Sequence, residues 1–139
     1  MYIDSLLLSA DTQTTTTSGA STSYIDTTVA SIKLGDAING LWWVVKTEAA
    51  FAGGAAATAQ WQLQTSNDAN FLDSTTITLA STGAFLTAAL TANTIMSRIK
   101  VPLGVKRYIR SYMVVGGTGV FTAATRSSFL TTDVDNLLP

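Results

Sequence analysis

Alternation of apolar and polar side chains is the main pattern along this chain, and it predicts strands rather than helices. Residues 58–65 place Trp61 and Leu63 on one side and glutamines on the other, a period of two that is typical of a half-buried strand. The segments 41–48 and 107–115 are rich in aromatic and β-branched residues and contain no glycine or proline. Shorter strands are predicted at 75–80, 95–101 and 120–124.

These segments predict an all-β protein with a single domain. About eight antiparallel strands fit one β-sandwich or jelly roll over residues 1–139, and the length leaves no room for a second domain. The alanine-rich stretch 49–57 contains a glycine pair and is predicted as a loose hairpin loop. Residues 85–90 fit either a strand or a helical turn, and the pattern leaves this choice open.

The segment 12–23 differs from the rest because it consists mostly of threonine and serine, with no charge and no large apolar side chain. Such a sequence buries too little apolar surface to offset its ordering entropy. We therefore expect an N-terminal arm at about 12–23, either a solvated loop or an extended segment that lies on a neighbouring molecule.

The composition excludes much chemistry. There is no histidine and no cysteine, and Glu48 is the single glutamate. The commonest general base and the thiolate nucleophile are therefore missing, and the aspartates are scattered. The turn 67–70 with Asp73 has oxygen ligands for a cation, but Asn and Asp favour such turns for backbone reasons alone. We expect no enzyme, no metal ion and no cofactor. No membrane helix is expected either, since no run approaches the ~20 apolar residues it needs.

Charge is sparse and unevenly distributed. Only 12% of the residues are charged, about half the usual share, which favours association with a partner or with further copies of the chain. Residues 98–126 carry six basic side chains and no acidic one. The net charge of −1 is weak for a nucleic-acid surface. We therefore expect the basic segment to face an acidic protein surface, and the chain to form a dimer or trimer.

Two predicted strands carry most of the candidate contact residues. Alternation along 107–115 puts Tyr108, Arg110 and Tyr112 on one face and Arg107 on the other. Such a row is typical of a protein interface, and it is equally compatible with a plain sheet edge that has no binding role. It fits a nucleic-acid surface less well. Adjacent tryptophans at 42 and 43 point to opposite faces, so one lies in the core and the other meets a second layer, a partner or solvent. The candidate partner interface comprises Trp42, Trp43, Arg98, Lys106, Arg107, Tyr108, Arg110 and Tyr112.

The order of several short motifs resembles the small cement, or decoration, proteins of tailed-bacteriophage capsids. The opening motifs are Tyr2-Ile3-Asp4, Leu8 to Gln13, a Ser/Thr run and Tyr24-Ile25-Asp26. The later motifs are the strand Trp42–Thr47, the strand and turn Gln62–Asp68, and Val101–Gly104 leading into Arg107–Arg110 and Gly116–Gly119. Together they cover nearly the whole chain.

This resemblance implies a jelly-roll subunit that oligomerises on the outer capsid surface of the virion after synthesis in the host cytoplasm. Its partners would be the major capsid protein, whose neighbouring copies it bridges, and further copies of itself, with no nucleic acid and no membrane. Two other classes of function stay open. One is a carbohydrate-binding jelly-roll module, which an outward tryptophan and an Asn/Asp turn would suit. The other is a structural subunit of a phage tail or fibre.

Overall fold

Antiparallel strands form almost all of the regular structure in the computed structural model, which describes residues 7–28 and 40–132. The long strands run between well-separated turns, as the period-two patterns predict. The motif at residues 2–4 lies outside the described residues. The strands are β1 (Leu8–Thr14), β2 (Gly19–Ala20), β3 (Ile25–Asp26), β4 (Trp42–Gly53), β5 (Ala57–Ser66), β6 (Ile77–Ser81), β7 (Phe85–Leu86), β8 (Thr94–Lys100), β9 (Tyr108–Gly117) and β10 (Phe121–Thr131).

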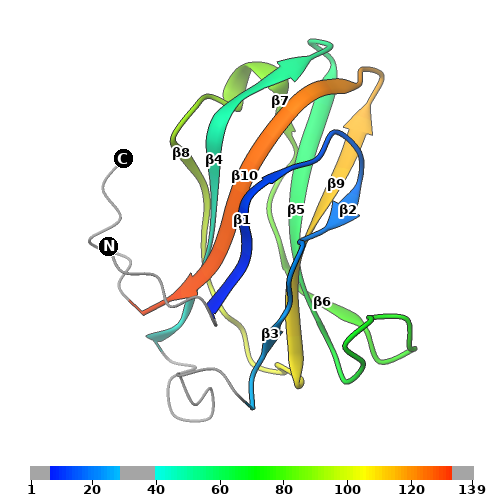
Figure 1. Ribbon diagram of the computed structural model, residues 1–139, viewed down its shortest axis with the longest axis vertical. Coiled ribbons are helices and arrows are strands. Elements are labelled where there is room, and N and C mark those ends of the chain that lie inside the picture. The colour runs from blue at the N-terminus through cyan, green and yellow to red at the C-terminus, as the bar shows by residue number, and fades with distance from the viewer. Residues whose placement is uncertain (1–6, 29–39, 133–139) are drawn as a thin grey trace.

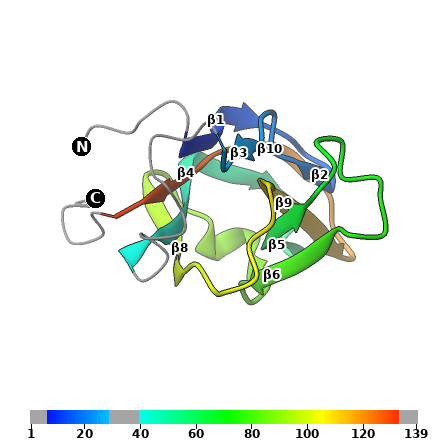
Figure 2. The same cartoon turned by 90° about the horizontal axis from the view of Figure 1, so that it is seen from below.

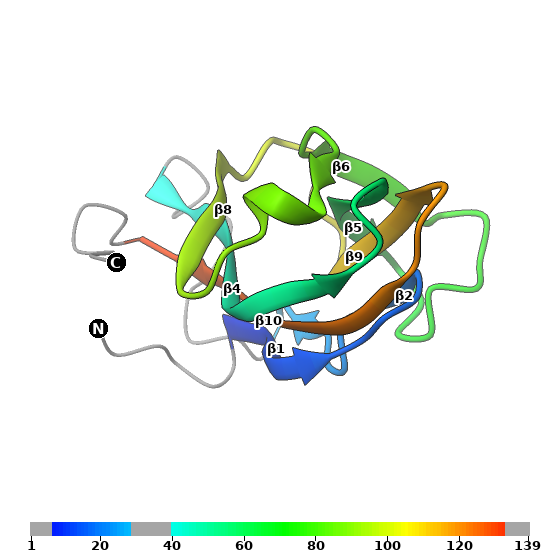
Figure 3. The same cartoon turned by 90° about the horizontal axis from the view of Figure 1, so that it is seen from above.

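The strands form two sheets that pack face to face (Figures 1, 2 and 3). Sheet A has the order β1-β10-β4-β8, and sheet B has the order β2-β9-β5-β6, with β3 beside β9 and β7 beside β5. All the described strand pairs are antiparallel. The predicted all-β sandwich is therefore confirmed. Residues 85–90, left open by the sequence, contain both alternatives: strand β7 and a 3-10 turn at Thr87–Ala89.

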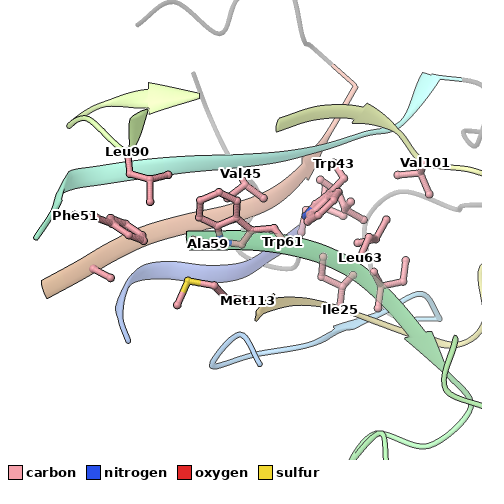
Figure 4. Packing of buried hydrophobic residues seen from close by; sticks show 14 of the residues in the cluster. Ile25, Trp43, Val45, Phe51, Ala59, Trp61, Leu63, Leu90, Val101 and Met113 are labelled. Atoms are coloured by element: carbon pink, nitrogen blue, oxygen red, sulfur yellow. The ribbon is translucent and has the colours of Figure 1, made fainter. Parts of the chain in front are cut away.

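The core between the sheets is built from the inward side of each alternating strand. Figure 4 shows Trp43 of sheet A and Trp61 of sheet B within it. In β5 the buried positions alternate with half-buried glutamines, which confirms the predicted strand and its faces. In β9 the same alternation buries Ile109, Ser111 and Met113. Burial of these large side chains supplies the main driving force for stacking the two sheets.

Two glycine-rich turns join the sheets at one end of the sandwich (Figure 1). The connections β4–β5 and β9–β10 each pass from one sheet to the other, and the Gly54 N–H donates to the Val120 carbonyl at 2.9 Å. Gly117 has a φ of +78°, and a Cβ there would overlap the Ala56 carbonyl oxygen. The predicted loose loop at 49–57 is mostly strand, because β4 continues to Gly53. Small residues are needed there for backbone to pack on backbone.

The second half of β10 was not predicted as a strand. Arg126, Ser127 and Ser128 are buried, yet the run has no apolar alternation. Pairing explains the strand, since β10 lies between β1 and β4 and both neighbours bond to its backbone. The buried hydroxyls also find partners, as in the 2.6 Å contact between Ser9 Oγ and Ser128 Oγ. Neighbouring strands, rather than local pattern, decide the structure of this segment.

The Thr/Ser segment is part of the sandwich, unlike the expected arm. Thr12–Thr14 complete β1 in sheet A, and Gly19–Ala20 form β2 in sheet B. The side-chain amide of Gln13 donates to the Ala20 carbonyl at 2.9 Å and its oxygen accepts from the Thr22 N–H at 3.1 Å. The Thr15 N–H donates to the Ala124 carbonyl of sheet A, and the Ser21 N–H donates to the Ser111 carbonyl of sheet B. Hydrogen bonds to both sheets therefore hold a segment that has little apolar surface to bury.

Candidate contact surfaces on two opposite faces

The structure divides the predicted interface residues between the two outer faces of the sandwich. Tyr108, Arg110 and Tyr112 share the outward side of β9, because the residues between them are buried on the inward side. Trp42 lies on the outward side of β4, since its neighbour Trp43 points inward. Trp43 is 1% exposed, so this residue belongs to the core and not to a contact surface. The single predicted interface is therefore two surfaces on opposite sides of the molecule.

Arg110 is the centre of the surface on sheet B. Its guanidinium carbon lies 4.2 Å from the centroid of the Phe71 ring and 5.5 Å from that of Tyr112. Its Nε donates to Gln64 Oε1 at 2.9 Å, and Gln64 in turn donates to Gln62 Oε1 at 3.2 Å. Partial burial lowers the pKa of the Arg110 guanidinium from its usual value. The two rings and the Gln64 hydrogen bond hold the guanidinium in one orientation before any partner binds. This reduces the entropy cost of binding.

An open pocket of about 110 Å³ adjoins this guanidinium. One wall is the segment 20–24 beside β9, and the other is the loop that carries Ala69 and Phe71. Arg110 is the charged side chain that lines the pocket, and serine and threonine hydroxyls line much of the rest. The loop residue Phe71 and the segment 20–24 were not predicted to belong to the site, because only the tertiary structure brings them to β9.

Arg107 lies just outside the strand on which alternation predicted it. It precedes β9 and is exposed, and its Nη2 forms a 3.1 Å ion pair with Asp26 Oδ2. Tyr108 lies beside it, with the Arg107 guanidinium carbon 4.9 Å from the ring centroid. Lys106 Nζ donates to the Thr75 carbonyl. Both cations are therefore engaged by the chain itself, and Arg110 is the stronger candidate for contact with a partner.

Asp26 is expected to make stability depend on pH in acid. The hydrogen bond from Arg107, followed by those from the Thr28 N–H and hydroxyl, lowers the pKa of Asp26 from 3.8 to about 2. A lowered pKa in the folded state means that this stabilisation is complete above about pH 4 and is lost as the pH falls towards 2. We expect Asp26→Asn to melt with a shallower pH dependence between pH 4 and 2, measured by thermal unfolding. Asp11→Asn is the control, and identical slopes for wild type and Asp26→Asn would contradict the prediction.

The surface on sheet A combines aromatic, aliphatic and basic side chains. Trp42 is half-buried there, and its strand partner is Lys100. Val44 pairs with Arg98 and forms a small apolar cluster with Phe129, separate from the main core. Arg98 and Lys100 are both exposed on edge strand β8. Aromatic and arginine residues over an apolar base are the composition of protein contact sites.

The carboxylates of the loop 66–76 are used by the loop itself. Asp68 accepts from the backbone N–H groups of Asn70 and Leu72 at 3.1 and 3.2 Å. Asp73 accepts from the hydroxyl of Thr75 and from that of Ser66, and these hydrogen bonds lower the pKa of its carboxyl. Across residues 7–28 and 40–132, no group of three or more acidic side chains lies close enough to hold a metal ion. The hydrogen bonds of Asp68 to the backbone that follows it are those of an Asn/Asp turn. In the same ranges, no helix has the length and apolar character to cross a membrane.

The fold and these surfaces define an antiparallel β-sandwich protein with a candidate contact surface on each outer face. A family model described as Bbp16 matches residues 9–130, which is most of the chain. The protein belongs to the Bbp16 family. None of the curated proteins matches its sequence.

Proposed function

We propose that this protein is a structural virion protein that binds the outside of a phage capsid and cements neighbouring major capsid proteins. The observation that carries the proposal is the division of its aromatic and basic contact residues between two opposite faces. A protein that joins two neighbours needs two contact surfaces, and a rigid sandwich holds these surfaces at a fixed separation. Trp42 anchors one surface and Arg110 the other.

Membership of the Bbp16 family supports the proposal, because the family name points to a phage-related protein. The matched residues 9–130 include most of the motifs that resemble capsid cement proteins. The chemistry also fits, since a cement protein works by contact area and copy number. Weak contacts repeated over many subunits give a stable shell through avidity.

Self-association and placement on the outer capsid surface are part of the same proposal. The low charge of the sequence motivates a dimer or trimer, and such an assembly would multiply the contacts that each unit makes with the shell. Light scattering of the isolated protein at micromolar concentration tests this point. A mass near that of one 14.6 kDa chain would count against it.

Co-sedimentation with empty shells of the same phage's major capsid protein tests the function. We expect saturable binding at a fixed molar ratio and a higher disruption temperature of the decorated shells. Lys100→Ala on sheet A and Arg110→Ala on sheet B should each lower occupancy, because each alters one surface. Absence of wild-type binding would refute the proposal. Specific binding on a glycan array without shell binding would favour the carbohydrate-binding alternative instead.

A further inference from the structure

Arg126 is a fully buried cation in the interior of the sandwich. It lies on β10, its relative exposure is 0%, and it shares the inward side of the strand with Ala124 and Leu130 of the core. Its Nη2 reaches across to the Gly19 carbonyl of β2 in sheet B, at a long 3.4 Å. The pairing of β10 is irregular on both sides at this point. The β1–β10 ladder has a register shift just before Gln13, the partner of Arg126, and the β10–β4 ladder has one between Thr125 and Arg126. The guanidinium thus lies between the two sheets.

Most of the hydrogen-bonding capacity of this guanidinium is unused. Nε and Nη1 are buried and have no hydrogen-bond partner. The other buried polar atoms without a partner in the described chain belong to neutral side chains, namely the indoles of Trp43 and Trp61 and the hydroxyls of Ser97 and Ser111. Among these buried groups of the described residues, Arg126 is therefore the one that carries a full charge.

The acidic side chains in residues 7–28 and 40–132 are engaged elsewhere. Asp26 pairs with Arg107 and Glu48 with Lys46. Asp11 accepts from the hydroxyl of its neighbour Thr12, and Asp68 and Asp73 accept from their own loop. Burial without a compensating charge lowers the pKa of Arg126 to about 10, which still leaves the group protonated at neutral pH.

A buried and uncompensated guanidinium is costly enough that its surroundings must supply a counter-charge. Buried charges in proteins are paired, because an unpaired one strongly destabilises the fold. Water would satisfy the two N–H groups but would leave the positive charge uncompensated. A small anion satisfies both requirements, because it accepts hydrogen bonds and cancels the charge.

We propose that Arg126 holds a small monovalent anion, of the size of chloride, between the two sheets of the sandwich. Nε and Nη1 are the donors of this site. Ser111, whose buried hydroxyl has no hydrogen-bond partner, lies on the inward side of β9, the strand that pairs with β2 at Gly19. The anion would tie β10 of sheet A to the β2–β9 edge of sheet B. A stabilising role, independent of any partner, follows from this position.

Bromide in crystals of the wild-type protein gives a direct test, because its anomalous signal locates the ion without any mutation. We expect a bromide peak within hydrogen-bond distance of Arg126 Nε and Nη1. In solution, chloride added at constant ionic strength to a gluconate buffer should raise the melting temperature of the wild type saturably. The rise should be about 3–6 °C once chloride exceeds its dissociation constant roughly tenfold.

Arg126→Met replaces the guanidinium with a shorter, unbranched and uncharged side chain, so this variant should melt independently of chloride. Arg107→Met is the matched control, because that arginine is exposed, and it should keep the wild-type response. Only water beside Arg126 in the bromide crystals, or a melting temperature of the wild type that does not respond to chloride, would overturn the proposal. The crystal experiment decides the matter even where Arg126→Met does not fold.

Discussion

Trp61→Ala is expected to destabilise the protein by about 3–5 kcal/mol, a large part of the 5–15 kcal/mol that holds a typical domain together. Trp61 is 0% exposed and lies in the middle of β5 (Figure 4). Its ring packs edge-on against Phe51 at 6.2 Å and lies 5.9 Å from Phe85. Alanine would leave a cavity between the sheets that these rings cannot fill. Urea unfolding followed by circular dichroism measures the loss.

Trp61→Phe is the informative companion to this variant. The indole N–H of Trp61 is buried without a hydrogen-bond partner, so a phenylalanine gives up ring volume but also removes an unsatisfied donor. We expect its cost to be well below that of alanine. Tyr24→Ala, at a residue 49% exposed, should change stability by less than about 1 kcal/mol. A loss below about 1 kcal/mol for Trp61→Ala would show that this ring is not central to the packing.

Arg110→Ala is expected to weaken binding to capsid shells by about 30- to 1,000-fold if our functional proposal holds. Gln64 and the rings of Phe71 and Tyr112 hold the guanidinium beside an open pocket, so a carboxylate of the partner would meet an oriented donor. A desolvated, charge-assisted contact at the centre of an interface carries an effect of that size. Titration of shells across a salt series measures both affinity and its electrostatic part.

Arg110→Lys and Arg107→Ala make this prediction specific. Lysine keeps the charge but loses the planar donor and the stacking, so we expect it to recover only part of the affinity. Arg107 is exposed and already paired with Asp26, so its replacement should change affinity by less than about fivefold. Wild-type affinity and unchanged salt dependence for Arg110→Ala would show that this guanidinium is only a solvated part of the sheet.

Local alternation was sufficient where a strand has one side in the core and the other in contact with water. β5 is the clearest case, because Trp61 and Leu63 alternate with glutamines, and the faces follow directly from the pleat. The outward row of β9 followed in the same way, and so did the opposite orientations of Trp42 and Trp43. In these elements the side of the sheet that each side chain faces depends only on its position along its own strand.

Local pattern failed where neighbouring segments supply the stabilisation. The second half of β10 is polar, and strand pairing on both sides fixes it, with Ser9 and Ser128 satisfying each other. The Thr/Ser segment lacks apolar residues, and the carbonyls of Ala124 in β10 and Ser111 in β9 hold it through backbone hydrogen bonds. Alternation could not place Arg107, because β9 begins after this residue and its side chain pairs with Asp26 of β3. None of these partners is near in sequence.

The sequence by itself determined the fold class, the division of the central strands into two faces and the absence of histidine and cysteine chemistry, because these depend on residue type and on a period of two. Only the tertiary structure decided which candidate residues share a surface. It placed Trp42 and Arg110 on opposite sides, brought Phe71 onto Arg110, and buried Arg126 between the sheets. The physical reason is that a period of two gives each side chain's orientation within its strand, whereas the distances between strands depend on long-range pairing and on which sheet each strand joins.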